Sequence, residues 1–404
     1  MSQTAPTTCW IKDKLFFGLG AREYLRSLLT PFNAVAAMIL LAGGVAAVVR
    51  FGQGLGTATN LSHDNPWGLW IGFDLLCGVA LAAGGYVISS TVYLFGLKAY
   101  QPIVRPAILT AFLGYAFVVL ALLFDLGRPW RLPYPFVVQA GFSSVMFEVA
   151  VCVATYCTVL FVEATPPAFE WLGWRKLRAV ILHLTIPLTI LGVILSTMHQ
   201  SSLGGLFLIA PGKLHPLWYS PYLPVFFFIS SIIAGLSMIV VEGSLSHRAL
   251  HHRADPGTDF DALTIGLARA GAIVMFSYFA LKILGVISDG NWTYLPTAYG
   301  SWFLVEVLGF VLVPCLLFAS AARNRRPRQV KLAALLSVLG VVLNRLNVSL
   351  VAFNWQLPCE QRYFPSWMEL AVTLSIILLI VLVFRSAALR MPILRPDPTY
   401  PEHP

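Results

Sequence analysis

Ionisable side chains lie inside stretches of this sequence that are otherwise apolar. A charged group in hydrocarbon is costly unless it faces protein or water, so each such residue is a candidate for function. When the apolar stretches are treated as membrane-spanning helices, residues from different helices fall at nearly the same depth, namely Asp74, Glu148, His199, Lys282, Glu306 and Arg345. Buried ion pairs, for example Arg345 with Glu306, would explain single residues. The set as a whole indicates a polar pocket inside an apolar bundle.

A pocket of this composition suits a quinone, which needs an apolar slot, donors for two carbonyls and groups that supply or accept protons. His199 suits the donor and relay role because histidine titrates near the operating pH. Asp74 and Glu148 suit proton relay, and Ser202 would add a donor. Trp70 would form an aromatic wall, although an interfacial anchor is the commoner role of such a tryptophan. The remaining charged groups are expected to set the electrostatics: Glu306, Arg345 and Lys282.

A sparser polar group lies toward the other side of the membrane. It consists of Glu242, His183 and Arg269, and it could mark a proton path to the pocket. Glu163 belongs to the same side, but contact with lipid headgroups is the favoured explanation for a charge so near a helix end.

The histidines and cysteines argue against a redox metal in this chain. The six cysteines include no Cys-x-x-Cys pair, so neither an iron–sulfur cluster nor a zinc site is encoded. Only His183 and His199 lie in apolar spans, both on the same one, and they stand roughly 24 Å apart along a helix. They cannot ligate one haem, which two facing helices usually hold. We therefore predict no metal site, and electrons for a quinone must come from another protein.

The composition requires a membrane fold. Of 404 residues, 58% are hydrophobic and 11% are charged, against about 25% charged in soluble domains. Because a span needs about 20 apolar residues, we predict an all-α polytopic membrane protein with ten transmembrane helices: 31–51, 69–97, 105–126, 143–165, 177–198, 219–243, 263–285, 300–322, 329–353 and 366–386.

A short internal echo suggests how these helices are grouped. Ser143 to Val149 and Ser301 to Val307 each place a glutamate five residues into a span, four spans apart. This spacing predicts two four-helix bundles, about 69–198 and 219–353, related by a parallel repeat and accompanied by flanking helices.

Lysine and arginine predict the orientation of the chain. They concentrate in the N-terminal segment, the even-numbered connections and the tail, and the odd-numbered connections hold only Arg128, Arg131, Lys213 and Arg362. Both termini should therefore be cytoplasmic in a bacterial inner membrane. The net charge of +9 reflects this asymmetry rather than nucleic-acid binding. We expect a cytoplasmic segment 1–30 with an interfacial helix from Lys12 to Leu29, a membrane domain 31–390 and a cytoplasmic tail 391–404.

The outer connections are long and rich in Trp, Tyr, Pro and Gly: 52–68, 127–142, 199–218 and 286–299. They predict either a structured face that receives a partner subunit or ordinary aromatic anchoring.

Several sequence blocks carry a family resemblance over about residues 30–390. They begin Asn65-Pro-Trp-Gly, Arg105-Pro-Ala, Asp125-Leu-Gly-Arg, Met146-Phe-Glu-Val, Thr197-Met-His-Gln, His215-Pro-Leu-Trp, Val241-Glu-Gly-Ser and Ser349-Leu-Val-Ala. In this order they resemble the NrfD/PsrC membrane-subunit family. Within it, the blocks are most similar to the branch of HybB-type hydrogenase subunits and the Hmc-complex membrane subunit.

The resemblance implies a haem-free, quinone-reactive membrane subunit of a respiratory oxidoreductase. It implies a periplasmic ferredoxin-like iron–sulfur partner, linked to a hydrogenase or a multihaem cytochrome, and menaquinone or ubiquinone as the membrane substrate. It also implies a quinone site near the periplasmic side, where Asp74, Glu148 and His199 fall. Some relatives are thought to couple quinone chemistry to proton translocation.

Two other functions stay open on the sequence alone. A secondary transporter would need a midplane site and broken helices, and the acidic groups lie off-centre. In a structural anchor, the buried charges would serve only helix packing.

Overall fold

The computed structural model describes residues 14–250, 252–253 and 255–398, and this part of the chain is helical, without β-strands. It confirms the predicted all-α membrane fold. Ten helices within the described residues are long and apolar enough to cross a membrane: Pro31–Gln53, Trp70–Leu94, Lys98–Asp125, Val145–Leu172, Arg175–Ile209, Leu223–Ala249, Phe260–Ser288, Ala298–Asn324, Pro327–Val351 and Trp367–Arg390. The chain is a multi-pass membrane protein.

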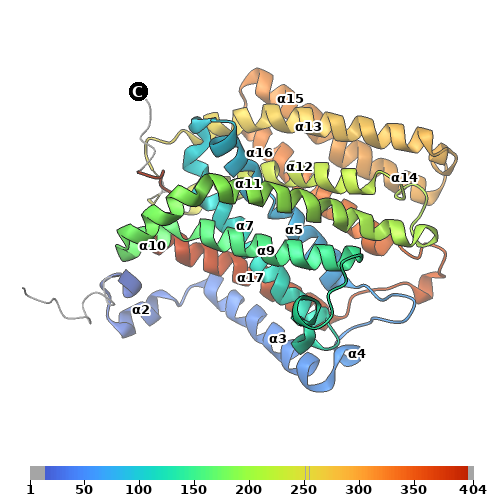
Figure 1. Ribbon diagram of the computed structural model, residues 1–404, viewed down its shortest axis with the longest axis horizontal. Helices are drawn as coiled ribbons and strands as arrows, with labels where there is room; N and C mark the ends of the chain where they lie inside the picture. Colours follow the sequence, from blue (N-terminus) through green and yellow to red (C-terminus); the bar gives the residue numbers. More distant parts are fainter. Residues whose placement is uncertain (1–13, 251, 254, 399–404) are drawn as a thin grey trace, which may run out of the picture.

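The second to fifth spans pack together as the first bundle (Figure 1). Span 2 consists of η1 (Trp70–Leu75), α5 (Leu76–Leu81), α6 (Gly84–Ser89) and η2 (Ser90–Leu94). The other three spans are η3 (Lys98–Ile103) with α7 (Val104–Asp125), α9 (Val145–Ala164) with α10 (Pro166–Leu172), and α11 (Arg175–Gly205) with η5 (Leu206–Ile209).

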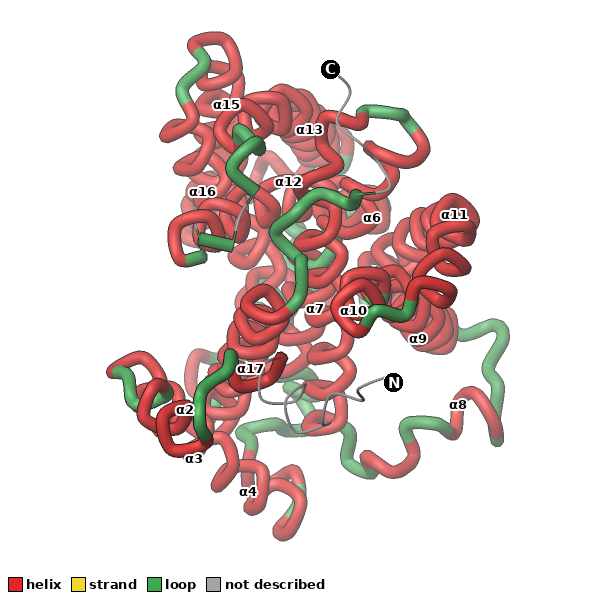
Figure 2. The backbone as a smooth tube through the Cα atoms, turned by 90° about the vertical axis from the view of Figure 1, so that its left-hand side faces the viewer, coloured by secondary structure: helices red, strands yellow, loops and turns green. Residues whose placement is uncertain are grey.

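The sixth to ninth spans form the second bundle. They are α12 (Leu223–Ala249), α13 (Phe260–Ser288), α14 (Ala298–Leu304) with η8 (Val305–Leu312) and α15 (Val313–Asn324), and α16 (Pro327–Leu346) with η9 (Asn347–Val351). Figure 2 shows α12, α13, α15 and α16 gathered on one side of the molecule, seen nearly along the helices.

Helix α12 joins the two bundles, because it contacts α5, α6 and α11 as well as α13 and α16. The crossing with α6 depends on glycine. A Cβ on Gly235 would lie 2.7 Å from the backbone nitrogen of Gly84, so the two backbones touch directly. Small residues allow this close approach between helices in a membrane.

The first and last spans, α3 (Pro31–Gln53) and α17 (Trp367–Arg390), pack on each other, and α17 packs on α7. Both begin with a side-chain cap. Thr30 accepts from the backbone of Asn33, and Ser366 forms a reciprocal capping box with Glu369. The flanking helices thus form a pair beside the first bundle.

The short elements mark the two ends of the molecule (Figure 1). We call the end with α2 (Ala21–Ser27), α10 and the segment after α17 the tail end, and the end with α4 (Leu55–Ala58), α8 (Tyr134–Val137) and α14 the loop end. Of the predicted interfacial helix, Lys12 lies outside the described residues, and α2 occupies part of the rest. The remaining short elements are η4 (Pro129–Arg131), η6 (Pro211–Lys213), η7 (Asn291–Tyr294) and η10 (Cys359–Gln361).

Candidate functional site

The predicted polar layer lies toward the loop end and divides into separate hydrogen-bonded groups. Two of its residues lie in wide π-type turns, Asp74 in η1 and Glu306 in η8, and Asn347, which donates to Glu306, lies in a third such turn, η9. Such turns are rare, and they occur frequently at functional sites.

His199 on α11 is fully buried and has partners on both ring nitrogens. Its Nδ1 lies 2.7 Å from the carbonyl oxygen of Leu195, so Nδ1 carries a proton and donates. Its Nε2 is hydrogen-bonded to the hydroxyl of Tyr115 on α7. The ring of Tyr156, on α9, lies 5.6 Å from the imidazole centroid. Three spans therefore enclose this histidine.

The pair of His199 and Tyr115 can reverse the direction of a hydrogen bond. In the neutral ring, Nε2 accepts the proton of the tyrosine hydroxyl. When the ring gains a second proton, both nitrogens donate. The Tyr115 hydroxyl then accepts from His199, and it can turn to donate its own proton to another acceptor. The sequence singled out the histidine but missed the tyrosine, whose only signal was its place in an apolar span.

Glu148 and Ser202 form a second pair at the loop end. The Ser202 hydroxyl donates to Glu148 Oε1 at 2.6 Å, and both residues are half-buried. Ser202 follows His199 by one turn of α11, so their side chains lie on the same face. The exposed Met146 is on the same helix as Glu148. Two of the predicted groups are thus neighbours, and one is near the molecular surface.

Asp74 is buried and faces the last span. Thr373 Oγ1 of α17 donates to Asp74 Oδ2 at 2.8 Å. Trp70 is also buried there, and its Nε1 donates to the backbone oxygen of Glu369 at 3.3 Å. Span 2 contacts α11 elsewhere, where the Gln200 amide donates to the carbonyl of Val79. Asp74 and Trp70 therefore belong to the side of α17, apart from the His199 pair.

Glu369 is a further buried acid, and it is not among the site residues that the sequence predicts. It accepts hydrogen bonds from the Tyr363 hydroxyl and from the backbone of Asn60 and Ser366. Burial and the bond to this carboxyl raise the pKa of Tyr363. The capping pattern of Ser366 and Glu369 was the signal available in the sequence.

Lys282, Glu306 and Arg345 belong to a buried network of the second bundle. Glu306 is 1% exposed, and its ion-pair partner is Lys282, whose Nζ is 3.3 Å from Oε1. Trp218, Asn344 and Asn347 donate to the same carboxylate at 2.7, 2.7 and 2.6 Å. Both carboxylate oxygens of Glu306 therefore have ion-pair or hydrogen-bond partners.

Arg345 does not fill the ion-pair role suggested for it. It donates to the side-chain oxygen of Asn344 at 2.9 Å and to Ser230 at 2.7 Å, and it stacks 3.7 Å over the ring of Phe227. The sequence could not show this, because the rotation of α16 places Asn344, rather than Arg345, against Glu306.

The predicted path toward the tail end is not assembled as expected. Glu242 is enclosed and accepts from Thr110 at 2.9 Å, but His183 and Arg269 are exposed. Glu163 also differs from its expected role, because it accepts from Thr189 on α11 at 3.1 Å and faces the bundle rather than headgroups. Only Glu242 retains the geometry of an internal relay.

An aromatic box surrounds His215 at the loop end of the second bundle. The imidazole stacks on Tyr299 at 4.6 Å and packs edge-on against Trp355 and Trp218. Burial lowers the pKa of His215 to about 4. Since Trp218 also donates to Glu306, the box connects this surface to the buried network.

Among the described residues, no group of three or more His, Cys, Asp and Glu side chains could hold a metal ion. The buried His199 faces two tyrosines rather than a second histidine.

The family described as polysulphide reductase NrfD matches residues 57–353 of the chain. The chain belongs to this family. An Escherichia coli protein named as a probable Ni/Fe-hydrogenase 2 b-type cytochrome subunit is 35% identical, over 86% of this NrfD chain and 88% of the relative. The integral membrane subunit of a menaquinone reductase from Nitratidesulfovibrio vulgaris is 27% identical, over 87% and 88% of the two chains.

A third relative from the same N. vulgaris, whose name states no function, is 57% identical over 93% of this chain and 97% of its own. The named relatives of this NrfD protein are membrane subunits of respiratory oxidoreductases. The chain is accordingly a membrane subunit of an electron-transport oxidoreductase complex.

Proposed function

We propose that this NrfD protein is the quinone-reactive subunit of its complex. It would exchange electrons between an iron–sulfur partner at the loop end and menaquinone or ubiquinone in the bilayer. The observation that carries the proposal is the pairing of His199 with Tyr115, one helical turn from the pair of Glu148 and Ser202. Quinone chemistry requires a hydrogen-bond donor for a carbonyl and an acid that can exchange protons with the surface, and these two pairs supply both.

The residues have different roles in the proposed quinone site. Tyr115 donates to a quinone carbonyl when His199 carries its second proton, and His199 thereby determines when the donor is available. Glu148 and Ser202, which are both half-buried, exchange protons with the loop-end surface. Asp74, held by Thr373, serves as a second relay, and Trp70 walls the side facing α17. Bound quinone supplies the two-electron acceptor or donor.

The partner and the orientation are part of the proposal. We place the tail end in the cytoplasm of a bacterial inner membrane, because lysine and arginine are concentrated there. The loop end would then meet a periplasmic ferredoxin-like subunit, fed by a hydrogenase or a multihaem cytochrome. Alkaline phosphatase fused after residue 404 should be inactive, and an active fusion would reverse this orientation.

Quinone-analogue binding to the purified complex tests the function. His199→Ala should abolish saturable fluorescence quenching by the analogue while the complex still assembles. His183→Ala is the matched control, because His183 is on the same helix, makes the same 2.7 Å bond to a carbonyl four residues earlier and is exposed. If His199→Ala binds like His183→Ala, the site is elsewhere. If the wild type fails to bind, a structural anchor or a secondary transporter is left.

Coupling to proton translocation is a second proposal, favoured by Glu242. This enclosed acid lies on the tail-end side of the polar layer, so protons could come from the cytoplasm while electrons come from outside. Proteoliposomes reducing quinone should then develop a membrane potential, which Glu242→Gln should diminish. Turnover without any potential would contradict coupling.

A further inference from the structure

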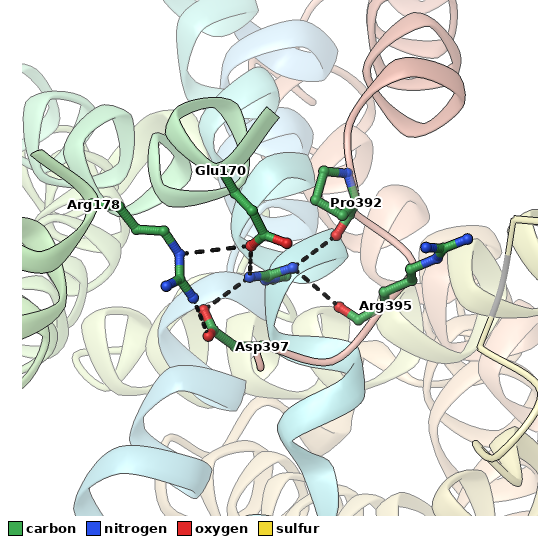
Figure 3. A network of polar contacts seen from close by, with 6 residues as sticks. Glu170, Arg178, Pro392, Arg395 and Asp397 are labelled. Atoms are coloured by element: carbon green, nitrogen blue, oxygen red, sulfur yellow. Dashed lines mark hydrogen bonds and ion pairs between the residues drawn. The ribbon is translucent and has the colours of Figure 1, made fainter. Parts of the chain in front are cut away.

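The segment that follows α17 is fastened to the tail end by two arginines. Arg105, in the first turn of α7, is almost completely buried and lies 2.9 Å from the Asp397 carboxylate and 2.7 Å from that of Glu170. Arg178 on α11 contacts the same two acids. Figure 3 shows Glu170, Arg178 and Asp397 pointing toward one another. Charged hydrogen bonds of this kind are among the strong ones.

Backbone contacts and apolar burial hold the same segment along its length. Arg105 Nη1 donates to the carbonyls of Pro392 and Arg395 at 2.9 and 3.5 Å (Figure 3). Ile393 and Leu394 are 2% and 8% exposed, in a cluster with Leu109 of α7. Ion pairs and apolar packing therefore hold the segment 392–397 in one position.

Residues of this segment line two cavities, each of which reaches a half-buried acid. Leu394 lines a cavity that reaches Glu242, whose Oε1 has no hydrogen-bond partner among the described residues. Ile393 and Asp397 line a separate cavity that reaches Glu163. Adjacent residues of the tail therefore face different cavities.

We propose that the segment 392–397 is a lid that controls access of water and small solutes to Glu242 and Glu163. The clasp of Arg105, Arg178 and Asp397 keeps the lid closed, Leu394 seals the Glu242 cavity, and Ile393 seals the Glu163 cavity. This inference concerns the tail end alone, and it does not depend on where quinone binds or on whether it binds.

Carbodiimide modification of the purified full-length complex tests the lid. Dicyclohexylcarbodiimide reacts with protonated carboxyls in apolar surroundings, and peptide mass spectrometry reports each acid separately. Asp397→Arg, repelled by both arginines, should speed modification of Glu242 and Glu163 roughly tenfold, as expected when charged hydrogen bonds that hold a closed state are lost. Adding Arg178→Asp restores an opposite-charge pair and should return the rates toward wild type. Glu23→Ala, which removes an exposed acid of α2 lining neither cavity, is the control.

Two milder variants give a signature that general loosening would not produce. Leu394→Ala should speed modification of Glu242 only, and Ile393→Ala of Glu163 only, because each residue lines one cavity. Both acids reacting faster in both variants would overturn the separate seals. Rates at the level of Glu23→Ala in these variants would overturn the lid itself, even if Asp397→Arg failed to assemble.

Discussion

Removing one partner of the ion pair between Lys282 and Glu306 should cost far more stability than removing one partner of the pair between Lys331 and Asp261. Lys282→Met leaves a carboxylate that is 1% exposed without the one ion-pair partner that it has among the described residues, and with neutral hydrogen-bond donors in contact with it. Removing one partner of a buried pair costs about 3–5 kcal/mol. Lys331 and Asp261 lie 2.8 Å apart, but their side chains are 38% and 53% exposed. Exposed pairs contribute about 0–1 kcal/mol, so Lys331→Met should cost little.

Unfolding of the purified protein by SDS in mixed micelles, followed by tryptophan fluorescence, measures both losses. The double variant Lys282→Met with Glu306→Gln removes both charges, so it should be at least about 1 kcal/mol more stable than Lys282→Met alone. The rings of Phe226, Tyr278 and Phe303 surround Lys282 Nζ, and a methionine fits among them. If Lys282→Met costs no more than Lys331→Met, the carboxylate is not the desolvated charge described above, and the reasoning fails.

Further predictions concern single contacts. Gly235→Ala should destabilise by about 1–3 kcal/mol through a backbone clash, whereas Gly44→Ala, with open space around its Cβ, should stabilise by about 0.5–1 kcal/mol; equal effects in thermal unfolding would contradict this. Tyr115→Phe leaves the buried Nε2 of His199 without its donor and should cost about 1–3 kcal/mol in the same assay. Because the folded pKa of His215 is about 4 and the ordinary value is 6.5, the native state binds fewer protons between them, and stability should fall as the pH drops from 6.5 toward 4. His215→Phe should lose this part of the pH dependence of the unfolding midpoint, and an unchanged curve would refute it.

The spans could be predicted because apolar length alone determines them, and the differences have local causes. The fifth span was expected to end at residue 198, but the helix continues to Ile209. The apolar run in the sequence ends at polar residues. The helix continues through them because His199 and Ser202 form hydrogen bonds to residues of neighbouring helices. Span 2 is divided between α5 and α6, which a hydropathy pattern cannot show.

For the candidate site, the sequence supplies the residue types, but it cannot supply their hydrogen-bond partners. Burial of an acid in a membrane demands a donor, but the sequence does not say which helix provides it. Thr373 donates to Asp74 from a span that was predicted only to flank the bundles. Trp218 donates to Glu306 from a connection between spans. Which side chains meet depends on the rotation of each helix about its axis. On α16, a difference of one position places Asn344 rather than Arg345 against Glu306.

The network of the second bundle contains two cations, Lys282 and Arg345, and a single anion, Glu306. The surplus charge is spread over the ring of Phe227, the oxygens of Ser230 and Asn344, and a backbone carbonyl. A fixed positive charge in a low-dielectric interior repels cations, as arginines do in selective pores. The second bundle is therefore expected to resist the entry of hydronium and sodium ions.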